Sequence, residues 1–434
     1  MKKYQVVQRS DGSWSVIRSG SKRASSVHRT QKEAILAGRA LATRSSGELV
    51  VHEGTGTVIY GSSPQVAKVE KPKNLSLAQR VGSRIQRARL MRGHSLRSLA
   101  EALNGEYSHT TLQKFEKGEI AQDTKLLGLL SNVLELRADY FLKQDELRLE
   151  TIEFRKFSKL GVKAQKQIEE EAFEFFERYL EIESILAIQR ERFPQYDLTD
   201  LKKEELDEVI EEKAFQLRKK WKLGMNPIPN IHSMLEDKGV KVKMLEARKG
   251  FDGISAFARS SNQRVPTIAL SNEFKTDIPR LRFTSLYELG HLVLKLPDYL
   301  TASEIEKACH RFAGAFLVPK EVFIETFGKN RVKISIPELK AIKAEWGLSF
   351  AATMKRAHNL GLISDGRYKG YNIMVNKLNL RTNEPQTWVG DEESYRFSHL
   401  VFRALSEGLI SMSKACGLLG LSYEDLSEEF ELAV

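Results

Sequence analysis

The chain has 434 residues, of which 41% are hydrophobic, and a net charge of +11. This length predicts two to four domains. No apolar run approaches the ~20 residues of a membrane span, and MKKYQVVQRSDGSWSV lacks the apolar core of a signal peptide. The two cysteines, Cys309 and Cys416, are too few for a disulfide framework. We therefore expect a cytoplasmic protein with no membrane partner.

The positive charge is unevenly distributed along the chain. Residues 1–145 hold 24 Lys/Arg and 13 Asp/Glu, whereas residues 146–434 hold 44 of each. The whole surplus therefore lies in the first third, where it would attract a polyanion such as DNA. A general solubility bias is the alternative explanation.

Residues 1–62 predict a small ββαββ unit. Apolar and polar residues alternate in YQVVQRS, WSVIRS, ELVVHE and TVIYG, as in half-buried strands, while QKEAILAGRALATR (31–44) has helical spacing. The stretches SVHRTQKEAI and GELVVH resemble a short uncharacterised bacterial domain, which brings no established activity. Its basic side chains could contact phosphates or lie on a solvated surface: Arg18, Lys22, Arg23, Arg29 and Arg39. Residues 63–75 predict a linker.

Residues 76–145 predict an all-α bundle of short helices. The segment SLRSLAEAL has one apolar face, and Ser108 can cap the helix that follows it. The residues predicted to face inward are Leu96, Leu99, Ala100, Leu103, Leu112 and Phe115.

This bundle resembles the helix-turn-helix of phage-repressor-like (XRE family) regulators. The resemblance implies that the helix after Ser108 reads base edges of double-stranded operator DNA. The predicted DNA contacts are Arg97, His109, Thr110, Gln113 and Lys114. The turn NGEY is longer than usual, and Leu96 stands where the family often has a glutamine that contacts phosphate. Such proteins usually read two half-sites, so we expect a homodimer.

Residues 146–195 predict a connecting or dimerisation segment. Residues 150–192 suit one long amphipathic helix, with apolar residues such as Ile168, Phe175 and Tyr179 on one side. A solvated strut against the next domain is the other interpretation.

Residues 283–294 read FTSLYELGHLVL, which differs by one letter from a zinc-protease helix. In such helices, two histidines at i and i+4 bind Zn²⁺, and the intervening glutamate activates the bound water. Glu288 holds the position of this general base and His291 that of the second ligand, but Tyr287 occupies the place of the first ligand. A neutral phenol is a far poorer zinc ligand than imidazole.

Residues 196–386 resemble the ImmA/IrrE family, a zinc-protease-like domain that often follows an XRE domain. The resemblance runs through DGISAFA, PTIALSN, RLRFTSLYELGHLVL and EIEKACHRFAGAFLVP, and it implies a mostly helical, zincin-like fold with a small sheet. It also implies that Glu306 matches the third metal ligand. His310 lies four residues later on the same helix face and could complete a set with His291 and Glu306. We expect no cofactor, with zinc binding through His310 as the alternative.

Residues 387–434 predict a helical C-terminal segment. The stretch ISMSKACGLLGLSYEDL indicates two helices with Gly420 and Ser422 at the turn, and the acidic run YEDLSEEFE disfavours contact with DNA. We expect this segment to bind protein or to pack within the chain.

Together these features predict a multidomain α+β protein that represses transcription. By resemblance, its partner would be a cognate toxin, with the degenerate peptidase-like domain binding that partner. An active zinc protease that cleaves a repressor or antitoxin is the alternative, and a ligand sensor with a pocket at the vacated zinc site is a third.

Overall fold

The computed structural model describes residues 3–430 except 10, 12, 19–20, 22, 31–32, 36, 39–40, 42–47, 54–55, 62–75, 144–146, 152–159, 261–262, 382–383 and 387. Lys22, Arg39 and the predicted linker lie outside the described residues. The chain divides into two compact units, Met1–Leu75 and Ser76–Val434. No described helix is long and apolar enough to cross a membrane.

The first unit is a five-stranded sheet with a helical segment between its third and fourth strands. The strand order is β3-β2-β1-β4-β5, and only the β1–β4 pair is parallel. Val6 and Val16 are fully buried in its small core with Ala34 of the helical segment. The strands are β1 (Lys3–Gln8), β2 (Trp14–Arg18), β3 (Ala24–His28), β4 (Glu48–Glu53) and β5 (Gly56–Gly61).

The ββαββ prediction is confirmed for four strands and the helical segment, but it missed β3. The sequence of β3, ASSVH, is small and polar, and its side chains are largely exposed. It is a strand because it pairs with β2 at the edge of the sheet, which hydrophobic alternation cannot reveal. In this unit Arg18, Arg23 and Arg29 are exposed.

The second unit begins with the predicted helical bundle, whose buried residues form one core. Each of its four α-helices starts at a Ser or Asp whose side chain accepts a hydrogen bond from the first turn. The elements are α2 (Leu77–Met91), α3 (Leu96–Ala102), α4 (His109–Lys117), α5 (Thr124–Leu134) and the 3₁₀ turn η1 (Ala138–Leu142).

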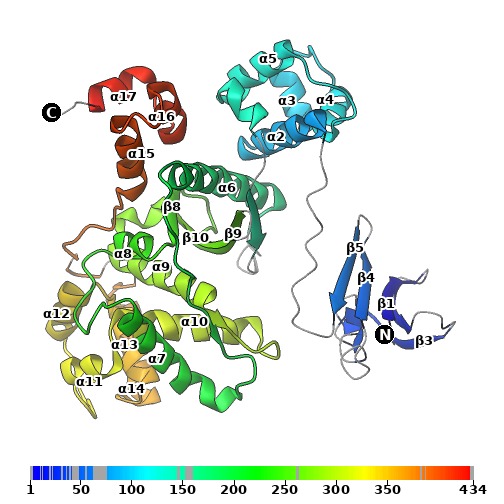
Figure 1. Ribbon diagram of the computed structural model, residues 1–434. Helices are drawn as coiled ribbons and strands as arrows, with labels where there is room; N and C mark the ends of the chain where they lie inside the picture. Colours follow the sequence, from blue (N-terminus) through cyan, green and yellow to red (C-terminus); the bar gives the residue numbers. More distant parts are fainter. Residues whose placement is uncertain are drawn as a thin grey trace. The chain divides into compact units, whose positions relative to one another are not determined.

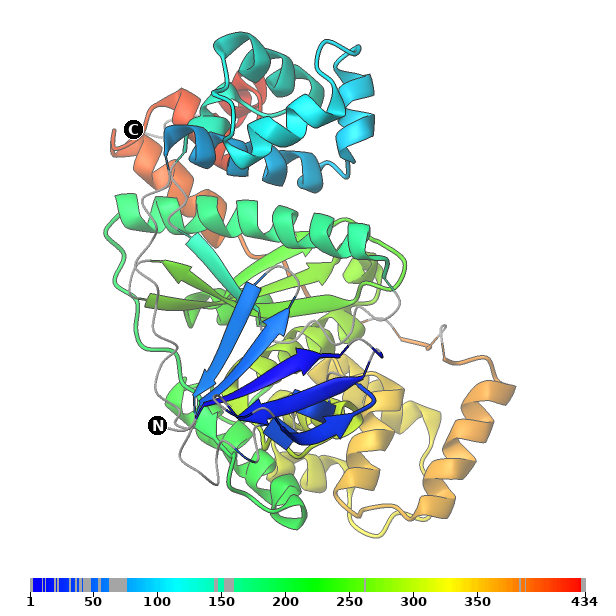
Figure 2. The same ribbon diagram turned by 90° about the vertical axis from the view of Figure 1, so that its right-hand side faces the viewer.

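A four-stranded sheet lies beside the long helix α6 (Val162–Ile185), as Figures 1 and 2 show. Its order is β6-β9-β10-β8, with β8 parallel to β10 and the other pairs antiparallel. The strands are β6 (Leu147–Thr151), β8 (Lys241–Leu245), β9 (Gly253–Ser260) and β10 (Gln263–Ser271).

The structure corrects the prediction of one helix over residues 150–192. Residues 147–151 form β6, which pairs with β9 more than a hundred positions later, and α6 ends at Ile185. The apolar face of α6, including Phe176, Tyr179 and Ile182, is buried against the sheet and the C-terminal helices. This face is therefore covered within the chain, as expected of a helix that packs against the next domain, and whether the protein forms a dimer stays a prediction.

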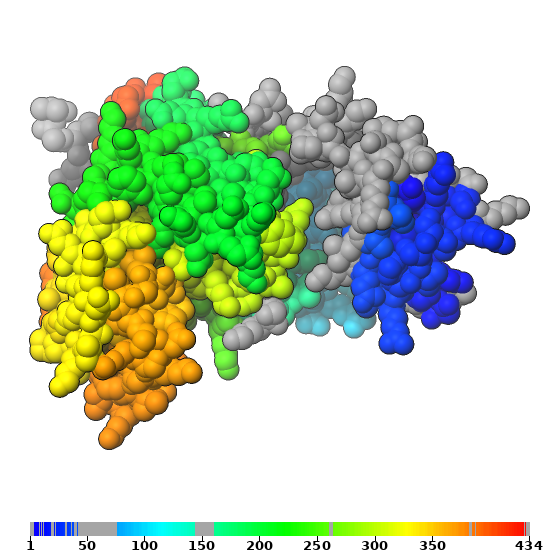
Figure 3. All heavy atoms as spheres, turned by 90° about the horizontal axis from the view of Figure 1, so that it is seen from below, coloured from blue at the N-terminus to red at the C-terminus, as the bar shows by residue number. Residues whose placement is uncertain are grey.

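The other face of the sheet packs against α9, which carries the YELGH sequence, and further helices pack around α9. Figure 3 shows the atoms of α11 to α14, in yellow and orange, as one lobe beside α7 in green. The helices are α7 (Lys203–Lys220), α8 (Ile231–Asp237), η3 (Asn272–Thr276), α9 (Ile278–Val293), α10 (Ala302–Leu317), α11 (Lys320–Phe327), α12 (Ile336–Trp346), α13 (Phe350–Asn359) and α14 (Asp365–Lys377). A short parallel pair joins β7 (Tyr196–Asp197) to β11 (Leu294–Lys295).

The C-terminal segment packs within the chain, one of the two outcomes that the sequence left open. It forms α15 (Arg396–Ser406), α16 (Met412–Leu419) and α17 (Tyr423–Glu429), with Gly420 and Ser422 at the predicted turn. Its apolar residues join the core around α6. The Arg178 guanidinium of α6 also donates a 2.6 Å hydrogen bond to the Leu418 carbonyl.

Candidate functional site

Helix α4 presents a row of polar side chains on a rigid base. The Ser108 hydroxyl accepts a hydrogen bond from the Thr111 backbone N–H at 3.1 Å, and Leu112 and Phe115 are buried in the bundle. The five predicted DNA contacts are all exposed: Arg97 on α3, and His109, Thr110, Gln113 and Lys114 on α4. Their placement suits contact with base edges, and their role in binding DNA stays a prediction.

Two features fix the packing of α4 against α2. A Cβ atom on Gly82 would stand 2.3 Å from the Phe115 carbonyl oxygen, so only glycine allows the two helices to approach this closely. The buried guanidinium of Arg89 forms a two-pronged ion pair with Glu116 of α4, with N–O distances of 2.5 and 2.9 Å. A recognition helix benefits from such rigidity because its base contacts depend on orientation.

The charge split along the sequence overstates the free positive charge of the bundle. Arg84 and Arg87 on α2 are buried and pair with Glu177 and Glu170 of α6, at 2.5 and 2.8 Å. The Arg87 guanidinium also lies 3.5 Å from the centre of the Phe173 ring. These arginines therefore dock the bundle on α6 and are not available to a polyanion.

The residues of the zinc-protease motif come together where α9 crosses α10. Gly290 permits this crossing, because a Cβ there would lie 3.3 Å from the Cα of Cys309 on α10. The Glu306 carboxylate of α10 lies close enough to Tyr287 of α9 to raise the pKa of its phenol. The motif positions inferred from sequence are thus neighbours in space.

Tyr287 fills the place of the first ligand with an uncharged aromatic ring. Its side chain is 1% exposed, and its ring makes an edge contact with His291 at 4.8 Å and a tilted contact with His310 at 4.6 Å between ring centres. Burial, and then the neighbouring Glu306 carboxylate, raise the pKa of Tyr287 far above its usual value. The phenol therefore stays protonated at neutral pH.

Glu288 is buried on the other side of α9, toward the sheet. The Ser255 hydroxyl of β9 donates a 2.8 Å hydrogen bond to its carboxylate, and both residues are less than 5% exposed. Ser255 was not among the residues predicted for the site. Its only signal in the sequence was its place in the DGISAFA stretch.

These residues do not fit a zinc ion. The first ligand position holds a buried neutral phenol, which is a poor donor to Zn²⁺. Among the described residues, no group of three His, Cys, Asp or Glu side chains is arranged to hold a metal. His310 is exposed and stacks on Phe283 at 5.7 Å, so it faces the surface beside Tyr287.

A large cleft opens beside Tyr287. It has a volume of about 1100 Å³ and is lined by Tyr287, Phe283 and His310 together with residues from α13, α14 and the segment before α15. Two of its cations, Arg356 and Lys343, are paired with Glu211 and Glu384. The cleft is therefore lined by both aromatic and charged side chains, and at least two of its cations already have protein partners.

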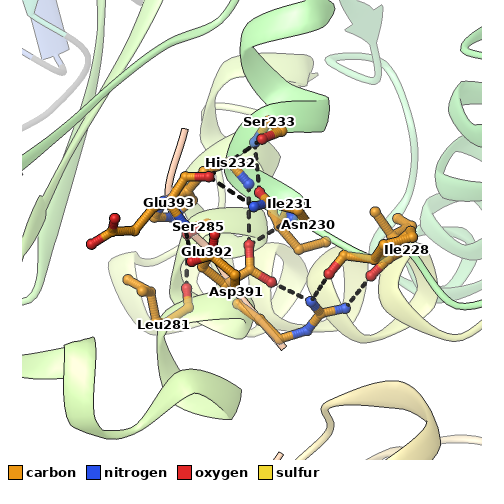
Figure 4. A network of polar contacts seen from close by, with 12 residues as sticks. Ile228, Asn230, Ile231, His232, Ser233, Leu281, Ser285, Asp391, Glu392 and Glu393 are labelled. Atoms are coloured by element: carbon orange, nitrogen blue, oxygen red, sulfur yellow. Dashed lines mark hydrogen bonds and ion pairs between the residues drawn. The ribbon is translucent and has the colours of Figure 1, made fainter. Parts of the chain in front are cut away.

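A buried ionic network, which the sequence did not predict, ties the segment before α15 to this domain (Figure 4). The Glu392 carboxylate pairs with the fully buried Arg282 of α9 and accepts hydrogen bonds from the backbone N–H groups of Ile231 and His232, at 2.6 and 3.2 Å. His232 also contacts the Ser285 hydroxyl at 2.9 Å, and burial lowers the pKa of His232 to about 4. One carboxylate thus joins α8, α9 and the C-terminal segment.

Comparison with protein families assigns three parts of the chain. Residues 85–141 match a helix-turn-helix family, and residues 238–358 match the IrrE N-terminal-like domain of the M78 peptidases. The chain carries an XRE-type helix-turn-helix domain and an IrrE-like domain. Residues 4–59 match an uncharacterized protein conserved in bacteria (DUF2188). No significant match was found among curated proteins or solved structures.

These matches confirm the resemblances inferred from sequence. The helix-turn-helix match includes α4, and the IrrE-like match includes α9 and α10 with Tyr287, Glu288, His291, Glu306 and His310. The IrrE-like match supplies most of the lining of the cleft beside Tyr287, and its sheet is completed by β6 from outside the matched range.

Proposed function

We propose that this protein is a DNA-binding transcriptional repressor whose IrrE-like domain binds a partner and does not cleave it. The observation that carries the DNA-binding half is the exposed polar row of α4 on a rigid helix-turn-helix core. By the resemblance to XRE–ImmA/IrrE regulators, the partner would be a cognate toxin and the protein an autorepressing antitoxin.

The second half of the proposal is supported by Tyr287. Hydrolysis by this fold needs three metal ligands and a general base. The Tyr287 phenol stands in place of the first of these ligands. The 1100 Å³ cleft beside it remains open to a bound segment. Glu288, His291 and Glu306 are retained, which favours an active zinc protease as the second candidate.

The first test is sequence-specific DNA binding by the full chain. We expect Lys114→Ala or Thr110→Ala to weaken binding to a selected duplex by about 1–3 kcal/mol, roughly 5- to 150-fold, because each change removes one base contact. Fluorescence anisotropy on selected and scrambled duplexes measures this loss. Affinity should also fall steeply with added salt.

Lys377→Ala is the matched control, since this exposed lysine lies on α14 of the IrrE-like domain. It should leave DNA affinity unchanged. If the Lys114 and Thr110 variants bind the selected duplex as tightly as the unmodified chain, α4 does not read DNA.

The second test concerns the oligomer. We expect two chains per operator, because two half-sites one helical turn apart require two recognition helices. Since α6 is covered within the chain, the interface must use another surface. Light scattering of the protein, free and on DNA, measures this; a monomer in both states would refute it.

A further inference from the structure

A second cavity lies apart from the cleft at Tyr287, at the C-terminal end of α6. It has a volume of about 830 Å³ and is bounded by the segment after α6, the ends of α7 and α8, strands β9 and β10, and the start of α15. Its lining carries eight Lys or Arg and four Asp or Glu side chains. We call it the basic cavity.

The floor of the basic cavity holds a buried carboxylate surrounded by three cations. Glu183 and Lys241 are each 1% exposed and lie 2.6 Å apart. Arg190 is 2.9 Å from the other oxygen of Glu183, and Arg396 lies 3.5 Å from the oxygen that Lys241 contacts. Three basic side chains therefore meet at this one carboxylate.

A second buried carboxylate, Glu236, lines the same cavity. It accepts a hydrogen bond from the Ser394 hydroxyl, and burial raises its pKa. The Nε atom of Arg396 is buried and has no hydrogen-bond partner among the described residues. The Arg396 Nε–H is thus a buried donor at this cavity to which an oxygen atom of a ligand could bind.

The rim adds four more cations, from the segment after α6 and from the ends of α7 and α8. Arg192, Lys220, Lys222 and Lys238 form no ion pair with any described residue. Lysines near the ends of α7 and α8 also complement the helix dipoles, which accounts for three of them. Arg192 lies beyond the end of α6, in the segment that leads to β7, and has no such explanation.

Aromatic side chains form the wall next to this rim. Phe193 is half-buried between Trp221 and Phe257, with ring centres 6.5 and 5.9 Å away. A planar ring can pack against such a wall while charged groups reach the neighbouring arginines and lysines. The cavity volume lies in the range of small-molecule sites.

We propose that the basic cavity binds a small anionic ligand that carries phosphate groups and a planar ring, a ligand of the nucleotide class. The phosphates would contact Arg190, Arg192 and Lys222, and the ring would lie on Phe193.

The place of the cavity on α6 gives the ligand a route to the DNA-binding domain. Glu183 lies in the last turn of α6, and the same helix holds the helix-turn-helix domain through Glu170 and Glu177. A ligand that binds Arg190 or Arg396 would weaken its ion pair with Glu183 and so change the contacts at the C-terminal end of α6. The coupling rests on the proposed function, whereas the binding site does not.

Titration calorimetry of the full chain with ATP, pyrophosphate and adenosine tests the site. ATP should bind, and the double variant Arg192→Ala/Lys222→Ala should weaken ATP binding at least about tenfold, since two charge-assisted contacts are lost. Phe193→Leu should weaken ATP and leave pyrophosphate unchanged. Lys377→Ala, which removes an equally exposed cation elsewhere, should change neither.

The outcomes separate the site from its role. Failure of the full chain to bind ATP at millimolar concentration, or ATP binding unaffected by the double variant, overturns the site. Pyrophosphate binding as tight as that of ATP overturns the ring contact. If ATP binds at the site but leaves the affinity for the selected duplex unchanged, the site stands and the coupling is overturned. The calorimetric result decides the site whether or not the protein binds DNA.

Discussion

Replacing Tyr287 with histidine is expected to raise the zinc content of the purified protein from near zero to about one ion per chain. The change restores the first imidazole of the motif, while His291 on α9 and Glu306 on α10 already adjoin this position. Imidazole binds Zn²⁺ as a neutral donor at pH 7. The phenol would have to lose its proton first, and burial opposes this by raising its pKa. Metal analysis of dialysed protein measures the change.

Tyr287→Phe is the matched control for this experiment, because it keeps the ring and should gain no zinc. Adding His291→Ala to the Tyr287→His variant should abolish the gain. One zinc in the unmodified protein, lost in His310→Ala and kept in Tyr287→Phe, would show instead that His310 supplies the missing ligand. Glu288-dependent cleavage of a partner by unmodified protein would overturn the ranking of repressor over protease.

Removing the charge of Glu392 should strongly destabilise the domain that contains α8 and α9. Arg282 and Glu392 have 0% and 1% exposed side chains, so Glu392→Gln leaves a buried guanidinium without its counter-charge. Breaking such a pair costs about 3–5 kcal/mol, which corresponds to a fall in the melting temperature of roughly 10 °C for a domain of this size. Calorimetry of the full chain measures the transition.

Glu393→Gln makes the same chemical change one residue away. Glu393 is 55% exposed and lies 3.6 Å from Lys275 at the surface, so its loss should cost less than about 1 kcal/mol. Adding Arg282→Met to Glu392→Gln should recover part of the stability, because the unpaired charge is then gone. Equal melting temperatures for the two single variants would refute the role of the buried pair.

The helix-turn-helix could be predicted from sequence because its signals are local. Ser108 immediately precedes α4 and caps it. Leu112 and Phe115, three positions apart in the sequence, mark the face of α4 that is buried. The YELGH motif is equally local, since Tyr287, Glu288 and His291 lie within five positions on one helix. The family resemblance then placed Glu306 beside them.

Pairings between distant segments were decided only in the folded chain. Residues 147–151 form strand β6 because they pair with β9. The apolar face of α6 is buried because the sheet and the C-terminal helices pack against it. Arg84 and Glu177 are 93 positions apart, and Arg282 and Glu392 are 110 apart. In the sequence, each of these charged residues would be expected on a solvated surface. Partners this far apart produce no periodic pattern in the sequence, because their burial and ion pairing depend on which elements the fold brings together. The sequence by itself determined the domains and the motif helix, and the tertiary structure determined which charges are free, where the basic cavity lies and how Tyr287 is enclosed.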